Sequence, residues 1–144
     1  LFEAAKATAL SLEPEAESAD VSISVTGEPA VIEGIPQLIG GIVYNLCDNA
    51  IKYNHKGGSV SVIVRKNDDS AVLTVRDTGI GIPAEDQNRV FERFYRVDKS
   101  HSKEVGGTGL GLSIVKHSAR IHGARISLES SVGEGTTVTV KFPV

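Results

Sequence analysis

Apolar residues recur along the chain at two spacings, one typical of helices and the other of strands. Helical spacing over residues 1–12 predicts a helix that Pro14 closes. A longer helix is predicted from Pro36 to Asn54, because proline suits the first turn of a helix. Two further helices are predicted, one over residues 83–94 and one that starts in the glycine-rich segment 105–114 and ends near His122.

Alternating apolar and polar residues predict strands in the other segments. Residues 21–27 alternate in this way, and residues 30–34 are a candidate short partner strand. Further strands are predicted on either side of the polar turn at 66–70, and over residues 124–131 and 135–144. Because the strands come in adjacent pairs instead of alternating singly with helices, they predict a mixed, mostly antiparallel sheet with helices covering one face.

The composition narrows the class of protein. With 144 residues, of which 40% are hydrophobic, the chain has the size of one domain, and residues 1–144 are predicted to form it. The absence of methionine predicts that this domain is a piece of a longer protein. The net charge of −3 does not indicate a nucleic-acid or membrane surface. The single cysteine, Cys47, excludes an internal disulfide and is predicted to be a packed apolar residue.

Four glycines stand within residues 106–111, directly before the last predicted helix. Their spacing does not complete the dinucleotide fingerprint G-x-G-x-x-G. The P-loop spacing G-x-x-x-x-G-K-[ST] is closer, but Leu112 stands where that motif has its lysine. The segment therefore offers backbone amides to a phosphate without a cation of its own, so positive charge and metal ligands must come from elsewhere in the chain.

A polar stripe is predicted on the long helix. Asn45, Asn49 and Lys52 lie at positions i, i+4 and i+7, which share one side of a helix. An asparagine carbonyl oxygen suits Mg²⁺, and a lysine one turn further on can meet a phosphate charge. A solvated helix face is the alternative interpretation of this stripe.

Asp77 ends a predicted strand and is followed at once by Gly79 and Gly81, which keep the backbone open for a flat ring. An ionised carboxylate only accepts hydrogen bonds, so it suits the exocyclic amine of adenine and rejects the carbonyl group of guanine. Ordinary turn chemistry is the alternative explanation for this pattern.

Positive charge gathers just before the glycine-rich segment. Residues 89–103 contain five lysines or arginines against two acids. Residues 97–107 lack apolar periodicity, and a loop of this length is either a lid over a site or a solvated linker.

The order of these segments is more specific than any one of them. The asparagine helix, "DTGIGIP", "FERFYR" and "GTGLGLSIVK" resemble the asparagine box, first glycine box, F box and second glycine box of the catalytic ATP-binding domain of sensor histidine kinases, within the GHKL ATPase superfamily. The resemblance extends over almost the whole chain, to the closing "GEGTTVTVKFP". It implies the Bergerat fold, a two-layer α/β (α+β) sandwich that binds ATP and Mg²⁺ between the long helix, the glycine boxes and a flexible lid.

The resemblance also implies roles for individual residues. Asn45 is the implied Mg²⁺ ligand and, with Lys52 and Arg96, forms the implied catalytic group. Arg96 is implied to reach the γ-phosphate, where a fixed guanidinium stabilises the charge of the transition state. Asp77 is implied to accept the adenine amine. The remaining implied nucleotide-binding residues are Asn49, Tyr53, Gly79, Gly81, Ile82, Gly107, Thr108, Gly109, Leu110, Gly111, Leu112 and Thr136.

None of the four histidines lies in a sequence like S-H-E-[LF]-R-T-P, which surrounds the phosphoacceptor histidine of this family. His55, His101, His117 and His122 are therefore predicted to be surface residues. The resemblance implies a protein-histidine kinase domain that binds ATP but does not phosphorylate itself efficiently. The acceptor histidine is expected on a separate dimerisation domain.

Three alternatives remain to be weighed. Gyrase-type ATPases carry a glutamate general base one turn before the first asparagine, where this chain has Gly41, so efficient hydrolysis is disfavoured. Anti-sigma serine kinases usually have that acid and lack the "FERFYR" region. A nucleotide-sensing or partner-binding module without turnover is expected to have a broken motif, and none is broken here.

The resemblance finally implies a setting in two-component signal transduction. The longer protein is expected to be a homodimer anchored in the membrane, with this domain in the cytoplasm. Its expected partners are ATP, its own dimerisation domain and the receiver domain of a response regulator, with no nucleic acid.

Overall fold

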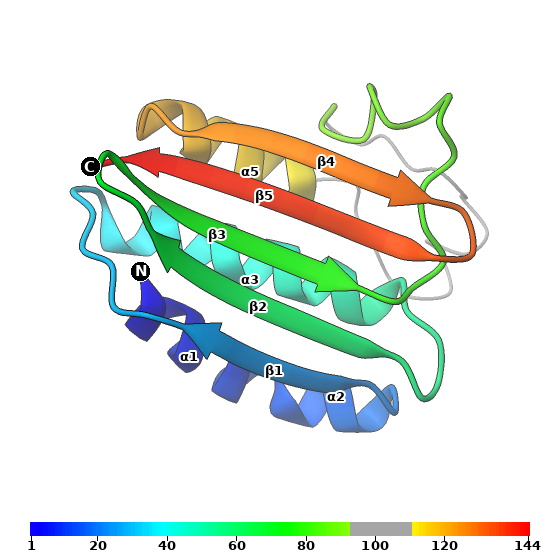
Figure 1. Ribbon diagram of the computed structural model, residues 1–144. Coiled ribbons are helices and arrows are strands. Elements are labelled where there is room, and N and C mark those ends of the chain that lie inside the picture. Colours follow the sequence, from blue (N-terminus) through cyan, green and yellow to red (C-terminus); the bar gives the residue numbers. More distant parts are fainter. Residues whose placement is uncertain (93–110) are drawn as a thin grey trace.

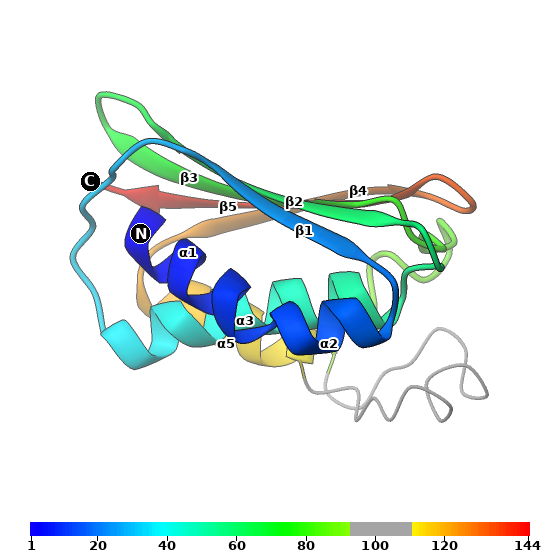
Figure 2. The same ribbon diagram turned by 90° about the horizontal axis from the view of Figure 1, so that it is seen from below.

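The computed structural model describes residues 1–92 and 111–144, and Figure 1 names the elements. In chain order they are α1 (Phe2–Ser11), α2 (Glu13–Ser18), β1 (Ser22–Gly27), α3 (Pro36–Lys52), β2 (Ser59–Lys66), β3 (Ser70–Asp77), α5 (Gly111–Ile121), β4 (Arg125–Ser131) and β5 (Gly135–Pro143). The strands form one sheet in the order β1-β2-β3-β5-β4. Figure 2 shows that these helices gather on one face of the sheet, which makes a two-layer α/β sandwich.

The sheet is mixed and mostly antiparallel, as the paired strands predicted. β1 and β2 are parallel, because the chain passes through α3 between them, and the other three pairs are antiparallel. The register places Asp77, the last residue of β3, opposite Val60 of β2 and Thr136 of β5. The sheet therefore carries Asp77 to its rim with a neighbouring strand on each side.

The long helix α3 forms where the sequence predicts it. Pro36 stands in its first turn after the extended residue Ile35, and the helix ends at Lys52, two residues before the predicted end at Asn54. Its buried residues all lie towards the sheet and the neighbouring helices. They are Ile39, Ile42, Val43, Leu46, Cys47, Ala50 and Ile51.

The core lies between α3 and the inner face of the central strands. Every second residue of β2 is buried, and the same alternation continues in β3 and β5 as expected for strands with one covered face. The apolar strand residues with the least exposure are Val60, Val62, Val64, Ala71, Leu73, Val140 and Phe142. The asparagine-bearing helix therefore has its orientation fixed by apolar packing.

Three segments differ from the sequence prediction. Pro14 does not close the first helix but stands in the first turn of a second one, α2, because proline needs no amide partner there. Residues 30–34 form no strand. Residues 83–92 form successive turns with hydrogen bonds three residues apart, such as Asp86 N–H to Pro83 O (2.9 Å) and Glu92 N–H to Arg89 O (2.9 Å), and not the regular helix predicted there. The rest of that predicted helix lies outside the described residues.

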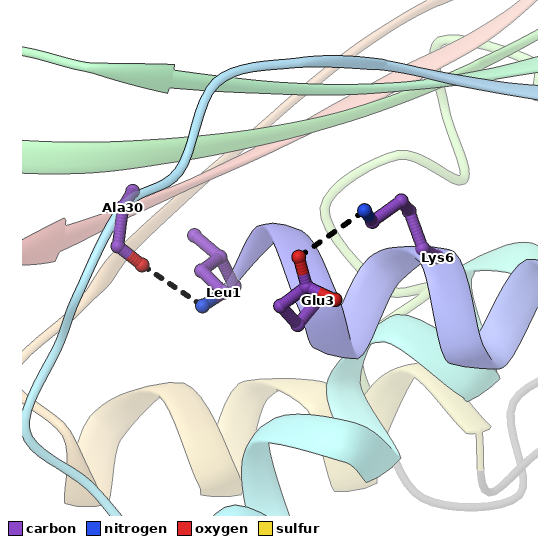
Figure 3. A network of polar contacts seen from close by, with 4 residues as sticks. All are labelled: Leu1, Glu3, Lys6 and Ala30. Atoms are coloured by element: carbon purple, nitrogen blue, oxygen red, sulfur yellow. Dashed lines mark hydrogen bonds and ion pairs between the residues drawn. The ribbon is translucent and has the colours of Figure 1, made fainter.

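The start of α1 is tied to the segment that follows β1. Figure 3 shows the amino group of Leu1 donating a hydrogen bond to the carbonyl oxygen of Ala30 at 2.9 Å. On the outer side of the same helix, Lys6 Nζ lies 3.1 Å from Glu3 Oε1. The buried side of α1 carries Ala5 and Ala9. Residues 28–34 are thus held against α1 without forming a strand.

We expect the core to be most sensitive where the sheet meets α3. Leu73 is fully buried, so Leu73→Ala leaves a cavity and should lower the free energy of unfolding by about 2–5 kcal/mol. Leu10→Ala is the matched control, because Leu10 is 68% exposed on α1 and its loss should change stability by about 0.5 kcal/mol or less. Denaturant unfolding of both variants measures the difference, and equal effects would contradict the described core.

Candidate functional site

The end of β3, the second half of α3 and the start of α5 meet at one end of the molecule (Figure 1). A Cβ atom added at Gly111, the first residue of α5, would lie 3.4 Å from Asn45 Oδ1 and 3.4 Å from Asn49 Nδ2. A Cβ added at Gly79, just after β3, would collide with the carbonyl oxygen of Tyr53 at the end of α3. The structure thus brings together segments that are far apart in the sequence.

The asparagine stripe of α3 faces the first turn of α5. Asn45 and Asn49 are both half-buried, and their amides stand beside Gly111. Asn45 Nδ2 donates to the carbonyl oxygen of Gly41 at 2.8 Å, which fixes the amide plane. Among the described residues no donor reaches Asn45 Oδ1, so this oxygen can act as an acceptor or ligand next to the helix start. These two amides thus face the start of α5.

Lys52, the third residue of the predicted stripe, has a partner that the sequence analysis missed. Its Nζ lies 3.0 Å from Oδ2 of Asp48, one turn earlier on α3. Asp48 is the less exposed partner, with 18% of its side chain exposed against 36% for Lys52. The i, i+4 spacing of an acid and a lysine was the available signal.

Asp77 is held by the backbone on two sides. Its Oδ1 accepts hydrogen bonds from the backbone N–H of Gly79 (2.8 Å) and of Thr136 (3.2 Å). Within residues 1–92 and 111–144 no donor reaches Oδ2, so one oxygen is fixed and the other can accept a further hydrogen bond. Burial raises the pKa of Asp77, and the hydrogen bonds from Gly79 and Thr136 oppose this shift.

The loop after Asp77 joins the end of α3 to the turn between β4 and β5. Ile80 N–H donates to Tyr53 O (3.0 Å), and Gly133 N–H donates to Ile80 O (2.9 Å). Gly81 has a φ of +76°, and a Cβ there would collide with the carbonyl oxygen of Ser131. Both Gly79 and Gly81 are therefore required by close backbone contacts. These contacts hold the loop beside the Asp77 carboxylate.

Ser130 is a second residue that the sequence analysis missed. Its Oγ accepts a hydrogen bond from Ile82 N–H (2.7 Å), donates to Gly135 O (2.9 Å) and lies 2.8 Å from Thr136 Oγ1. The pairing of Ser130 with Thr136 in the sheet could have indicated this contact. Ile82 and Thr136, two predicted nucleotide-binding residues, are thus joined through one hydroxyl.

Cys47 lies inside α3, next to Asp48, and is fully buried. Burial, with a smaller contribution from the charge of Asp48, raises the pKa of its thiol to about 12. A thiol in this state is not a nucleophile at neutral pH. The prediction that Cys47 is a packed apolar residue is confirmed.

Several predicted site residues lie outside the described residues. They are Arg96, Gly107, Thr108, Gly109 and Leu110, and the lid or linker predicted at 97–107 lies there too. Leu112 stands in the first turn of α5 and packs against the core. Tyr53 directly follows α3, and its backbone N–H donates to Asn49 O at 3.0 Å.

The histidines divide into two kinds. His55 and His117 are exposed, as predicted, and His101 lies outside the described residues. His122 departs from the prediction because it is half-buried and its ring makes polar contacts to two segments.

The oxygen ligands that the described residues offer fit a magnesium ion whose remaining ligands come from a phosphate and water. Among the described residues no group of three or more His, Cys, Asp or Glu side chains could hold a metal by itself. The open Oδ1 of Asn45 is a single hard oxygen ligand, and Mg²⁺ usually takes few protein ligands and completes its shell with water and substrate phosphates. The site therefore matches a metal that arrives with a nucleotide.

Comparison with known proteins identifies the family of the chain. Residues 34–144 match the family model of histidine kinase-, DNA gyrase B- and HSP90-like ATPases. The chain is 43% identical over 129 residues to the sensor-like histidine kinase SenX3 of Mycolicibacterium smegmatis, covering 89% of this chain and 34% of that protein. It is 44% identical over 104 residues to the sensor histidine kinase WalK of Bacillus subtilis, covering 71% of this chain and 17% of that protein.

A solved structure has the same fold over nearly the whole length. The mycobacterial sensor histidine kinase MprB superposes with a TM-score of 0.85 at 29% identity, over 98% of this chain and 93% of that chain. The chain spans only about a third of SenX3 and a sixth of WalK, so both relatives are much longer proteins.

The raised pKa of Asp77 predicts a pH dependence of stability. A carboxyl group with a higher pKa in the folded state binds its proton more tightly when folded, so protonation stabilises the fold. Asp77→Asn keeps an oxygen for the amides of Gly79 and Thr136 but carries no charge. We therefore expect the variant to be more stable than the wild type at neutral pH.

This advantage should shrink as the pH falls through the raised pKa of Asp77. It should vanish below the ordinary aspartate value of about 3.9, where both side chains are neutral. Thermal unfolding of both proteins across this pH range measures it. A wild type that loses stability relative to the variant on acidification would contradict the prediction.

Proposed function

The chain belongs to the family of histidine kinase-, DNA gyrase B- and HSP90-like ATPases, and from this premise we propose that it binds Mg-ATP and transfers the γ-phosphate to a histidine of a separate dimerisation domain. Residues 1–144 act together as this catalytic domain. One observation carries the proposal: a half-buried carboxylate with one open oxygen shares a site with two asparagine amides at a helix start.

The adenine ring is proposed to bind at Asp77. Oδ1 is occupied by two backbone amides, so Oδ2 is left to accept the exocyclic amine. Gly79 and Gly81 let the loop lie close to the carboxylate, and Ile82 and Thr136, joined through Ser130, complete this end of the site.

The phosphates are proposed to bind between α3 and the start of α5. Gly111 and Leu112 are the first described residues of α5, and backbone amides in the first turn of a helix favour an anion. Asn45 would hold Mg²⁺ through Oδ1, and the metal would add positive charge that stabilises the transferring phosphoryl group. Asn49 and Lys52 stand beside it on the same stripe, and Tyr53 packs near the nucleotide. Gly107, Thr108, Gly109 and Leu110 are proposed to continue the amide cradle.

Transfer to a protein acceptor is favoured over hydrolysis. Gly41, one turn before Asn45, has no side chain, and open space surrounds it, so no general base for water stands at this position. The nearest carboxylate on α3, Asp48, is engaged by Lys52. Arg96 is proposed to supply the guanidinium that stabilises the γ-phosphate charge, which completes the catalytic group with Asn45 and Lys52.

The proposed partners follow from this role. The acceptor is a histidine of the dimerisation domain, and the phosphate then passes to the receiver domain of a response regulator, within a homodimeric parent protein. Among the described residues no helix is both long enough and apolar enough to cross a bilayer. A membrane anchor, with this domain on the cytoplasmic side, is proposed for the parent protein. A nucleotide-sensing module without turnover is the alternative function.

Asp77→Asn tests the adenine assignment. The variant keeps the backbone hydrogen bonds but presents an amide N–H₂ donor to the adenine amine, so MgATP affinity should fall by about 10- to 100-fold. Asp68→Asn is the matched control, because Asp68 is exposed in the turn between β2 and β3. Calorimetry on both variants, with circular dichroism to check the fold, measures the effect. Unchanged affinity in Asp77→Asn would count against this site.

Gly111→Ala tests the phosphate end of the site. The added methyl group meets Asn45 and Asn49 at ordinary contact distance, so the fold should persist while the space for phosphate is filled and MgATP binding weakens. Gly40→Ala is the control, because a Cβ at Gly40 meets nothing within 4 Å. It should stabilise α3 by about 0.5–1 kcal/mol without changing MgATP affinity. Equal affinities for the two variants would contradict the assignment.

Labelled ATP distinguishes a kinase from a module without turnover. The chain should acquire little acid-labile label alone, and a separately made dimerisation domain of the same parent protein should be labelled when the two are mixed. Strong labelling of the chain alone would overturn the need for a separate acceptor. ATP binding without labelling of the dimerisation domain would favour the alternative function.

A further inference from the structure

His122 connects the end of α5 with the segment before α3. These contacts lie at the opposite end of the helix layer from Asp77. His122 follows α5, and its Nδ1 lies 2.7 Å from the carbonyl oxygen of Ser118 in that helix. Its Nε2 lies 3.0 Å from the backbone nitrogen of Ile35, the residue directly before α3. We call these two contacts the His122 bridge.

The two contacts fix the protonation of the ring. A backbone N–H can only donate, so the N–H of Ile35 requires a lone pair on Nε2. A carbonyl oxygen can only accept, so the contact to Ser118 requires the proton on Nδ1. The bridge therefore exists only with a neutral ring that carries its proton on Nδ1.

The surroundings of the ring are built to hold it in place. A Cβ added at Gly34 would lie 2.5 Å from Cδ2 and 2.6 Å from Nε2 of His122, so only glycine lets the chain pass this close. On another side, the ring meets Phe142 edge-on, with centroids 6.4 Å apart and planes at 79°. This environment differs from that of His55 and His117, which are exposed.

The bridge and the candidate site lie at opposite ends of the same pair of helices. Ile35 precedes the start of α3 and His122 follows the end of α5, whereas Gly111 at the start of α5 faces Asn45 and Asn49 further along α3. The two helices therefore run antiparallel. A shift of α5 along α3 would break the bridge and displace Gly111 from the two asparagines.

We propose that His122 is a positioning residue, whose neutral ring fixes α5 against α3 and so holds Gly111 at the distance from Asn45 and Asn49 that phosphate binding requires. This inference rests on the proposed ATP-binding function. Asp77 is held by the backbone amides of Gly79 and Thr136, and neither hydrogen bond of the His122 bridge reaches them. Phe142, which the ring contacts, pairs with Ala71 at the other end of β3 and β5, so the adenine end of the site does not depend on the bridge.

His122→Phe tests the proposal, because it keeps an aromatic ring against Phe142 and removes both hydrogen bonds. Only the bond to Ile35 joins the two helices, so ATP affinity should fall by about 3- to 10-fold, the equivalent of one lost hydrogen bond. Adenosine affinity should stay unchanged. His117→Phe is the matched control, since His117 is exposed on the same helix. A merely structural role would lower the melting temperature without changing the ratio of ATP to adenosine affinity, and that result would overturn the proposal.

A second measurement needs no nucleotide. NMR of the ring nitrogens should show the proton of His122 on Nδ1 in the nucleotide-free chain. Gly34→Ala should push the chain off the ring and shift the backbone amide of Gly111 and the side-chain amides of Asn45 and Asn49, as His122→Phe does. A proton on Nε2, or unchanged amide signals in both variants, would overturn the proposal. If the wild type bound neither ATP nor adenosine, the proposed function would fail while these signals still tested the bridge.

Discussion

The packing of α3 on the inner face of β2 and β3 is the interaction on which the rest of the structure depends. Its buried residues, such as Leu46 and Ala50, fix the rotation of the helix about its axis. Because a helix has a fixed phase, that rotation also decides where Asn45 and Asn49 point. Apolar burial thus sets the orientation of the polar side chains, and the free energy for holding the asparagines in place comes from residues buried in the core.

The site has two supports of different kinds. The carboxylate of Asp77 is held by the sheet, through the backbone of Thr136 and the loop residue Gly79. The amides of Asn45 and Asn49 depend on how α3 and α5 lie against each other. The proposed ligand, with a flat ring at one end and phosphates at the other, would span both supports. Only the helix pair can shift without disturbing the hydrogen-bonded register of β3 and β5.

The sequence predicted the structure well in segments whose helical or strand conformation follows from the pattern of residues adjacent in the sequence. Alternation in residues 59–66 and 70–77 and the apolar side of α3 reflect local periodicity, and the strands and long helix followed from it. Ser130 and His122 could not be found in this way, because their partners lie in other segments. Residues 30–34 have strand-like composition but pair with no strand, and the carbonyl oxygen of Ala30 accepts a hydrogen bond from Leu1 instead. Proline at 14 was ambiguous, because it suits both the end of one helix and the start of the next.

The ion pair between Lys52 and Asp48 changes how far the charge of Lys52 reaches. With Nζ and Oδ2 only 3.0 Å apart, the pair acts from a distance as a dipole, whose potential declines with separation faster than that of a single charge. Salt screens what remains beyond about 8 Å. On a chain with a net charge of −3, Lys52 therefore does little to attract an anion from solution. In the proposed function its influence would be confined to an anion already in contact, so this lysine would affect how long a phosphate stays more than how fast it arrives.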